Sequence, residues 1–187
     1  MKSKFVSKTG IATFAIFSLA LFFTSCKKDK DNEPSKTKTI TEVVSTSANF
    51  STLKSAVVKA NLAATLSGPG PFTVFAPDND AFTASGITSG VIGSLSADQI
   101  KDILLYHTIG SKIMAADVPA GPNAAVTTAG GGTLYVTKNS NGVFVNGWKV
   151  TTADIAASNG VIHSIEHVLM PAPGNLVEVA QTNSNLT

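Results

Sequence analysis

Residues 159–171, NGVIHSIEHVLMP, constrain the fold of this chain more than any other segment. The segment is rich in β-branched side chains, is introduced by the turn-forming pair Asn159-Gly160 and is closed by Pro171. This composition favours an extended strand over a helix, where β-branched side chains lose rotamer freedom. A strand sends alternate side chains to the same face, and that face comprises Val161, His163, Ile165, His167 and Leu169.

The same segment contains HSIEH, which matches the H-x-x-E-H order of zinc ligands in one class of metalloproteases. That chemistry needs a helix, because only helical spacing brings His163 and His167 onto adjacent turns. In a strand their α-carbons lie roughly 13 Å apart, too far for one zinc ion that binds each nitrogen at about 2.1 Å. A metal-dependent hydrolase built on HSIEH is therefore the least favoured hypothesis.

Residues 49–66, NFSTLKSAVVKANLAATL, carry the pattern of an amphipathic helix. The apolar side chains recur at steps of three and four residues, at Phe50, Leu53, Val57, Ala60 and Ala64. Asn49 is suited to cap the first turn. The sequence GPGP at 68–71 then breaks the chain.

A strand and two further helices are predicted next. FTVFAP reads as a short strand that stops at Pro77, and Asp78 is suited to cap the brief helix NDAF. Ser96 and Gln99 form a capping box before a second amphipathic helix. The apolar face of that helix comprises Ile100, Ile103, Leu104 and His107.

Beyond this helix the pattern changes to β. TLYVTKNSNGVFVNG, residues 133–147, is two alternating runs around Asn141-Gly142, a pair that tolerates the positive φ of a type I′ hairpin turn. Helices and strands are mixed without the regular alternation of a parallel sheet, so we predict an α+β domain.

The N-terminal residues 1–25 have the features of a secretory signal peptide. Three lysines precede an apolar run of 13 residues at 11–23, and small polar residues follow it. A bilayer crossing takes about 20 residues, so a permanent membrane span is not expected.

Cys26 is the only cysteine, which excludes a disulfide within the chain and any CxxC site. LFFTSC, residues 21–26, resembles a bacterial lipobox, in which the cysteine is acylated and becomes the mature N-terminus. We expect Cys26 to be the lipidation site that holds the protein on a membrane. The alternative is a soluble secreted protein with a free thiol.

Residues 26–38 read as a flexible charged tether, because they alternate charge sign and have almost no apolar surface to bury. The opening CKKDKD resembles the signal that follows the lipidated cysteine in surface-exported lipoproteins of the Bacteroidetes type. We therefore expect the protein on the outer membrane, exposed at the cell surface. The alternative is an ordinary linker on a periplasmic lipoprotein.

The net charge argues against nucleic-acid binding. The chain has 14 basic residues, all lysine, against 12 acids, which gives +2. From Thr39 onward, six lysines stand against nine acids, so this part of the chain carries −3. A domain with no arginine and no basic patch lacks the contacts that bind phosphates and read bases.

The final residues, 174–187, repeat an earlier pattern. LVEVAQTNSNLT at 176–187 matches ITEVVSTSANFS at 40–51 at four identical positions, at an interval of 136 residues. We interpret this tail as the start of a second repeat, with chance similarity between two helix starts as the alternative.

Three segments together resemble the signature of the fasciclin, or FAS1, domain. They are FTVFAPDNDAF at 72–82, LLYHTIGSKI at 104–113 and NGVIHSIEHVLMP at 159–171, in this order and spacing. The resemblance covers residues 39–173. It implies helices packed on a wedge or sandwich of short β-strands, in proteins that mediate adhesion or matrix contacts outside the cell.

The resemblance implies no catalytic residue set, and we expect no cofactor and no metal. The expected function is a non-enzymatic adhesion or extracellular-binding module. Its expected partners are an unknown extracellular protein or polysaccharide, together with the membrane through the N-terminal lipid. A glycan-associated accessory lipoprotein is the alternative.

Four positions remain as candidate contacts or ligands. Tyr106 and His107 match the Tyr-His motif that the resemblance links to adhesion in some members, although His107 continues an apolar helix face, which favours a structural role. Trp148, the only tryptophan, is a possible glycan contact if it is exposed. Asp78 and its polar neighbours suit calcium chemically, but capping of a helix explains Asp78 better.

Overall fold

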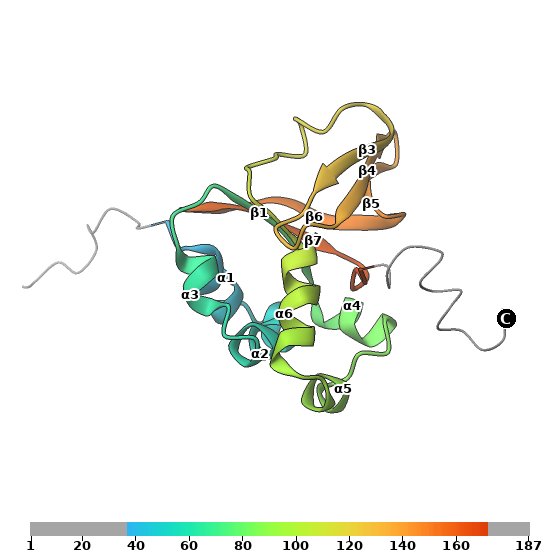
Figure 1. Ribbon diagram of the computed structural model, residues 1–187. Coiled ribbons are helices and arrows are strands. Elements are labelled where there is room, and N and C mark those ends of the chain that lie inside the picture. Colours follow the sequence, from blue (N-terminus) through green and yellow to red (C-terminus); the bar gives the residue numbers. More distant parts are fainter. Residues whose placement is uncertain (1–36, 172–187) are drawn as a thin grey trace, which may run out of the picture. The chain divides into compact units, whose positions relative to one another are not determined.

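The computed structural model describes residues 37–171 of the chain. In chain order its elements are α1 (Ile40–Thr46), η1 (Ala48–Phe50), α2 (Ser51–Lys59), α3 (Ala63–Ser67), β1 (Phe72–Pro77), α4 (Asn79–Ala84), α5 (Ser89–Ser94), α6 (Ala97–Tyr106), β2 (Thr108–Ile109), β3 (Gly121–Thr127), β4 (Thr133–Asn139), β5 (Gly142–Val145), β6 (Trp148–Ala157) and β7 (Gly160–Ile165). The helices lie on one side of β1 and β7, and β3, β4 and β5 lie on the other (Figure 1). The domain is α+β, as predicted.

The strands form one bent sheet in the order β2-β1-β7-β6-β5-β4-β3. β7 pairs in parallel with β1, and the other neighbouring pairs are antiparallel. The long strand β6 joins the two halves, because it pairs with β5 near its start and with β7 along its length. Its pairing with β7 shifts register twice, and Asp154 has a positive φ of 59° in the second irregular stretch. Irregularities of this kind bend a sheet, and the bend produces the predicted wedge.

Two apolar cores follow from this arrangement. The helical core lies between the helices and β1/β7 and includes Ile40, Phe50, Leu53, Val74 and Ile162. The wedge core lies between the two halves of the sheet and includes Phe75, Leu134, Val136, Val145 and Ile165. β1 serves both, because Val74 and Phe75 point to opposite faces of the strand.

Helix caps with partners close in sequence agree with the prediction. The Asp78 side chain accepts a hydrogen bond from the Ala81 backbone N–H at 2.8 Å and so caps α4. Ser96 and Gln99 form the predicted capping box at the start of α6.

The long helix predicted over 49–66 is wrong, because the chain breaks it in two. α2 ends in a Schellman motif: Asn61 has a φ of 54°, its N–H donates to Val58 O, and the Leu62 N–H donates to Val57 O. Asparagine tolerates this left-handed conformation better than most residues. α3 then starts in a new direction.

The predicted cap at Asn49 is also wrong, because Asn49 lies inside η1. The cap of α2 comes instead from Asn79, whose Oδ1 accepts hydrogen bonds from the Thr52 N–H at 3.1 Å and the Ser51 hydroxyl at 3.2 Å. A side chain of another helix therefore satisfies donors that the local sequence leaves open.

The predicted hairpin forms, but its turn is displaced. Asn139 pairs with Gly142, so the two turn residues are Ser140 and Asn141. The positive-φ Asn-Gly turn expected there occurs between β5 and β6, where Asn146 and Gly147 have φ values of 48° and 87°.

Candidate functional site

The two histidines of HSIEH occupy different places in the fold. His163 lies in β7, which ends at Ile165, and His167 lies in the bend that follows. The prediction of a strand is confirmed over β7, but the alternation expected to reach His167 and Leu169 stops with the strand. Neither histidine is in a helix, so the spacing that a metalloprotease site requires is absent.

His163 ties β7 to two other parts of the chain. Its Nε2 lies 2.8 Å from Ile113 O, and its Nδ1 lies 3.1 Å from the Asp154 backbone N. Because the Asp154 N–H donates to Nδ1, the ring proton lies on Nε2 and is donated to Ile113 O. The contact of 3.9 Å between Nδ1 and the Asp154 carboxylate is therefore not an ion pair for this tautomer. The ring also stacks on Phe75, with centroids 5.6 Å apart.

His167 faces a different group of residues. Its ring stacks on Trp148 with centroids 3.9 Å apart and planes inclined by 8°, and its Nδ1 lies 3.0 Å from the Ser85 hydroxyl. The same hydroxyl accepts a hydrogen bond from the Val168 N–H. Within residues 37–171, no group of three or more His, Cys, Asp or Glu residues is placed to hold a metal ion.

Trp148 is 41% exposed at the start of β6. The His167 ring covers one face of the indole, and the rest of the side chain is partly exposed to solvent. An exposed aromatic ring can stack on the apolar face of a sugar. The structure brings Trp148 together with His167, a pairing that the sequence did not indicate.

His107 is almost completely buried at the end of α6, at 1% exposure. The Leu169 backbone N–H donates to its Nε2 at 2.9 Å, so its Nδ1 carries the proton and donates to Ile103 O at 2.8 Å. Burial lowers the pKa of this imidazole from its ordinary 6.5 to about 4, and the hydrogen bond to Ile103 acts in the opposite direction. The ring joins α6 to the segment after β7.

Tyr106 turns toward the opposite side, into the wedge core. Its hydroxyl donates to Thr133 O at 3.0 Å and accepts from the Asn146 side chain at 3.1 Å, so it connects α6 with β4 and the turn after β5. An edge of the ring reaches an open depression of about 490 Å³. The other residues around this depression are Asn123, Thr133, Tyr135, Asn146 and Gly147.

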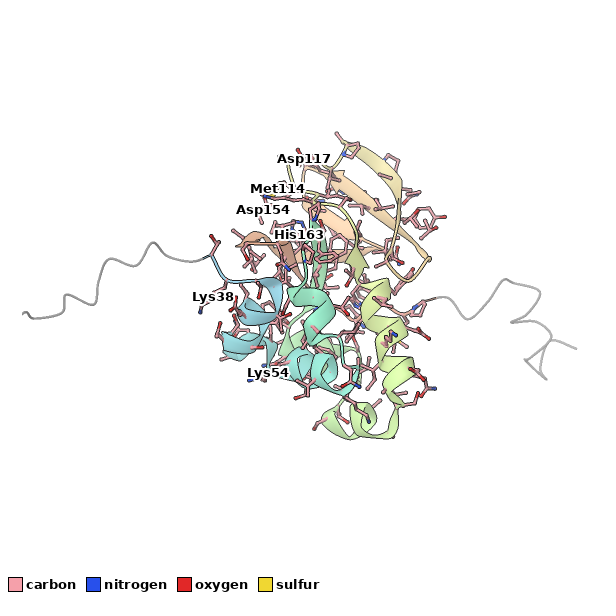
Figure 2. All side chains as sticks on the ribbon, turned by 60° about the vertical axis from the view of Figure 1, so that its left-hand side comes forward. Lys38, Lys54, Met114, Asp117, Asp154 and His163 are labelled. Carbon is pink, nitrogen blue, oxygen red and sulfur yellow. The ribbon has the colours of Figure 1, made fainter. Side chains whose placement is uncertain are left out.

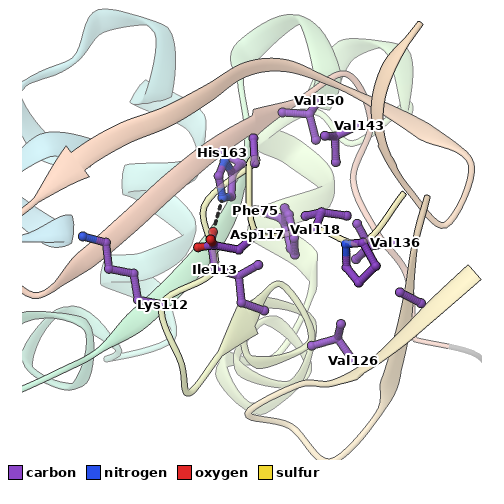
Figure 3. A pocket seen from close by; sticks show the side chains of 13 residues that line it. Phe75, Lys112, Ile113, Asp117, Val118, Val126, Val136, Val143, Val150 and His163 are labelled. Carbon is purple, nitrogen blue, oxygen red and sulfur yellow. Dashed lines mark hydrogen bonds between the residues drawn. The ribbon is translucent and has the colours of Figure 1, made fainter. Parts of the chain in front are cut away.

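A pocket of about 210 Å³ opens between the two halves of the sheet (Figure 3). We call it the wedge pocket, and it is lined by Phe75, Lys112, Ile113, Ala115, Asp117, Val118, Pro119, Ala124, Val126, Val136, Val143, Val150 and His163. Most of these side chains are apolar. The pocket is not evident from the sequence, because its walls come from β1, β3 to β7 and the loop between β2 and β3.

The β2–β3 loop, residues 110–120, is held over the wedge pocket by polar side chains. The Thr73 hydroxyl donates to Ser111 O at 2.6 Å and accepts from the Ile113 N–H at 2.8 Å. His163 holds Ile113 O, as described above.

Two charged side chains complete this attachment. The Asp154 carboxylate accepts from the Ala115 N–H at 2.9 Å, and the Lys138 ammonium donates to the carbonyls of Ala115 and Ala116 at 2.9 and 3.1 Å. Met114, Asp117, Asp154 and His163 lie together at this end of the domain, away from Lys54 on the helical side (Figure 2). Four strands therefore contribute side chains that fix one loop.

Asn159, predicted to be only a turn residue, connects three segments. Its Oδ1 accepts from the Ile40 N–H at 3.0 Å, and its Nδ2 donates to Leu66 O and Gly68 O at 2.9 and 2.8 Å. It thereby joins the start of α1 to the end of α3. The next residue must be glycine, because a β-carbon on Gly160 would collide with the carbonyl of Phe72.

Both carboxylate oxygens of Asp78 have hydrogen-bond partners within the domain, which disfavours a role as a calcium ligand. One carboxylate oxygen caps α4, and the other lies 3.4 Å from the Ser164 hydroxyl. Capping of a helix, the preferred interpretation of Asp78, agrees with this geometry.

The predicted lipidation site at Cys26 and the tail at 174–187 lie outside the described residues. Within 37–171, no helix is both long enough and apolar enough to cross a membrane.

The fasciclin domain profile matches residues 48–171. Protein sll1483 of Synechocystis sp. (strain ATCC 27184 / PCC 6803 / Kazusa) is 45% identical over 137 residues, which are 71% of this chain and 73% of that protein. Transforming growth factor-beta-induced protein ig-h3 of Oryctolagus cuniculus is 36% identical over 73% of this chain, but the match spans 20% of that protein. Periostin of Homo sapiens is 31% identical over 72% of this chain and 16% of its own length.

A solved structure of a FAS1 domain pair from the insect cell adhesion molecule Fasciclin I aligns with a TM-score of 0.47 and 23% identity. It covers 69% of this chain and 45% of the solved one. The profile match over residues 48–171 and the relative at 45% identity each show the family, and this chain belongs to the fasciclin family.

Proposed function

We propose that the protein is a non-enzymatic, surface-anchored module for adhesion or extracellular binding. The hydrogen bonds made by the imidazole nitrogens of two histidines give this proposal its strongest support. The ring nitrogens of His163 and His107 are all hydrogen-bonded to backbone groups of the domain itself. Groups committed to the scaffold in this way are not free to act as bases or metal ligands. The family to which the chain belongs adds adhesion and matrix contact as the expected role.

The anchor in this proposal is a lipid on Cys26, followed by the charged tether of residues 27–38. At about 5 to 6 Å times the square root of the number of residues, such a tether would hold the domain roughly 20 Å from the membrane. The domain would face outward from the outer membrane. The net charge of −3 that the chain carries from Thr39 onward suits contact with proteins or glycans better than contact with anionic lipid headgroups.

Attachment assays on cells that produce the protein test this function. Deletion of the chain should reduce attachment to protein-coated or polysaccharide-coated surfaces, and Cys26→Ala should give the same loss because the variant has no lipid to hold it at the cell surface. Attachment that is unchanged by deletion would contradict the proposal. Protease shaving of intact cells tests the location separately, because a periplasmic protein would remain uncut.

Tyr106 and His107 act, in this proposal, as scaffold residues and not as direct contacts. Both side chains are buried, and their polar atoms are bonded to the backbone or to Asn146. A partner could reach His107 only if α6 moved away from the sheet, whereas Tyr106 borders the open depression described above.

Glycan capture is the second candidate function, and the stacked pair of Trp148 and His167 favours it. Oligosaccharides should quench the fluorescence of Trp148, the only tryptophan, and protect it from acrylamide. Trp148→Ala should abolish binding to a polysaccharide matrix. Tyr135→Ala is the matched control, because Tyr135 is an exposed aromatic residue on β4. Equal binding by both variants and the wild type would rule out Trp148 as the contact.

A further inference from the structure

We infer that the wedge pocket is a binding site for one small, uncharged, apolar molecule of the size of a single substituted ring. Neither the Tyr-His motif nor Trp148 lines this pocket. The pocket is therefore separate from the residues considered for adhesion and glycan capture. Three properties of the pocket support the inference: its volume, the chemistry of its walls and the way in which its loop is held.

The volume sets the size of the ligand. Benzene binds in an engineered protein cavity of about 150 Å³ that is lined by leucine, isoleucine and phenylalanine. The wedge pocket measures about 210 Å³ and has walls of the same kind. It therefore has room for one ring with a small substituent, and it is too small for a typical drug-sized ligand, whose pockets begin at about 300 Å³.

The walls set the chemistry of the ligand. Two of the polar residues that line the pocket already have partners inside the domain: His163 uses both ring nitrogens, and the Asp117 carboxylate accepts from the Met114 N–H at 3.1 Å. The side chain of Lys112 lines the rim, but its ammonium points away from the valines (Figure 3). A charged group in the pocket would lose its hydration without gaining a partner. An uncharged ligand avoids that cost.

The attached loop explains how the pocket stays open. An apolar void favours collapse of its walls, because closer packing regains lost contacts. Here the β2–β3 loop cannot easily move inward, because Thr73, His163, Asp154 and Lys138 hold its backbone from four strands. The pocket is thus formed in advance of binding, which lowers the entropy lost when a ligand enters.

Calorimetric titration of the protein with toluene, and with benzoate as its charged counterpart, tests the inference. The protein is the chain from residue 26 onward, secreted with a foreign signal and carrying Cys26→Ser, so that neither lipid nor detergent competes for apolar probes. Toluene should bind with one-to-one stoichiometry. Benzoate should bind at least tenfold more weakly. Equal or tighter binding of benzoate would overturn the assignment to uncharged ligands.

Variants that fill the pocket locate the binding. Val126→Phe and Ala124→Leu, both on the edge strand β3, should each weaken toluene binding more than tenfold without lowering the melting temperature. Val58→Phe is the matched control, because Val58 is 62% exposed on α2, and it should leave the affinity unchanged. Either β3 variant suffices if the other fails to fold.

Two outcomes overturn the inference. The first is the absence of toluene binding by a correctly folded protein. That result would indicate that the pocket receives an apolar side chain of a protein partner and not a small molecule. The second is toluene binding that both β3 variants retain, which would place the ligand elsewhere.

Discussion

At the scale of single residues, the histidines show how the fold uses polar side chains. His107 and His163 each accept a hydrogen bond from a backbone N–H through one nitrogen and donate to a backbone carbonyl through the other. The two rings have opposite tautomers, because the accepting nitrogen is Nε2 in His107 and Nδ1 in His163. Each ring therefore joins segments that are distant in sequence.

Because of His107, the domain should become less stable as the pH is lowered. In the native state its pKa is lowered to about 4, whereas the unfolded chain takes up this proton near 6.5. Between these values the unfolded state binds more protons than the native state, so stability decreases as the pH falls. The contribution is present in full above about pH 6.5, and its loss amounts to roughly 3 kcal/mol by pH 4.

Urea denaturation at pH 7 and pH 4.5 measures this effect. His107→Gln keeps a donor and an acceptor but cannot titrate, so its stability should depend much less on pH over this range. The same pH dependence in the variant and in the wild type would show that other groups are responsible.

The Tyr106 hydroxyl should contribute to stability and not directly to binding. Tyr106→Phe removes the hydrogen bonds to Thr133 O and from Asn146, and the loss should be about 1 to 2 kcal/mol. Chemical denaturation checks the stability, and the attachment assay checks function at a temperature where the variant is folded. Normal stability with lost attachment would instead identify Tyr106 as a contact residue.

At the scale of elements, what the sequence predicts depends on how far away the partner lies. Asp78 and the pair Ser96/Gln99 were predicted as caps because their partners are three residues away. The cap of α2 was missed because Asn79 lies 27 residues from Thr52, whose backbone N–H donates to the Asn79 side chain. The break at Asn61 had a local signal, a residue that tolerates positive φ, but the apolar periodicity on both sides concealed it.

The wedge pocket was beyond prediction for the same reason. Strand alternation identifies Leu134 and Val136 as buried. It does not reveal that the opposite wall of the pocket leaves a space in front of this strand. That depends on contacts such as the one between Thr73 and Ile113, which are separated by 40 residues.

The attachment of the β2–β3 loop can be tested at Asp154. Asp154→Ala removes the acceptor for the Ala115 N–H and places alanine at a φ of 59°, so it should destabilise the domain by about 2 kcal/mol. Amide hydrogen exchange at 113–117 should become faster. Asp154→Asn is the control, because asparagine keeps an acceptor oxygen and tolerates positive φ. Exchange in Asp154→Ala that is as slow as in the wild type would show that the carboxylate does not hold the loop.

Asn159 should be among the most sensitive positions in the helical half. Asn159→Ala leaves the Ile40 N–H and the carbonyls of Leu66 and Gly68 without their partner, and the expected loss is about 3 kcal/mol. Asn159→Asp restores only the acceptor, so it should rescue little of the loss. A melting temperature near that of the wild type in both variants would contradict this role.

At the scale of the whole molecule, β1, β6 and β7 connect the helical core to the wedge core. The centre of this framework is β7, which is buried along its full length and carries one of the two histidines of HSIEH. The interpretation of the protein as a binding module depends on that strand, because a helix there would place both imidazoles on one face and allow a catalytic metal.

Calorimetric titration with zinc tests this most directly. The protein should carry Cys26→Ser and no histidine tag, so that HSIEH is the only histidine pair at metal-ligand spacing. We predict no stoichiometric binding at micromolar zinc, and identical traces for the wild type and for His163→Gln and His167→Gln. One-to-one zinc binding that each of these substitutions abolishes would contradict the structure of β7 and the function inferred from it.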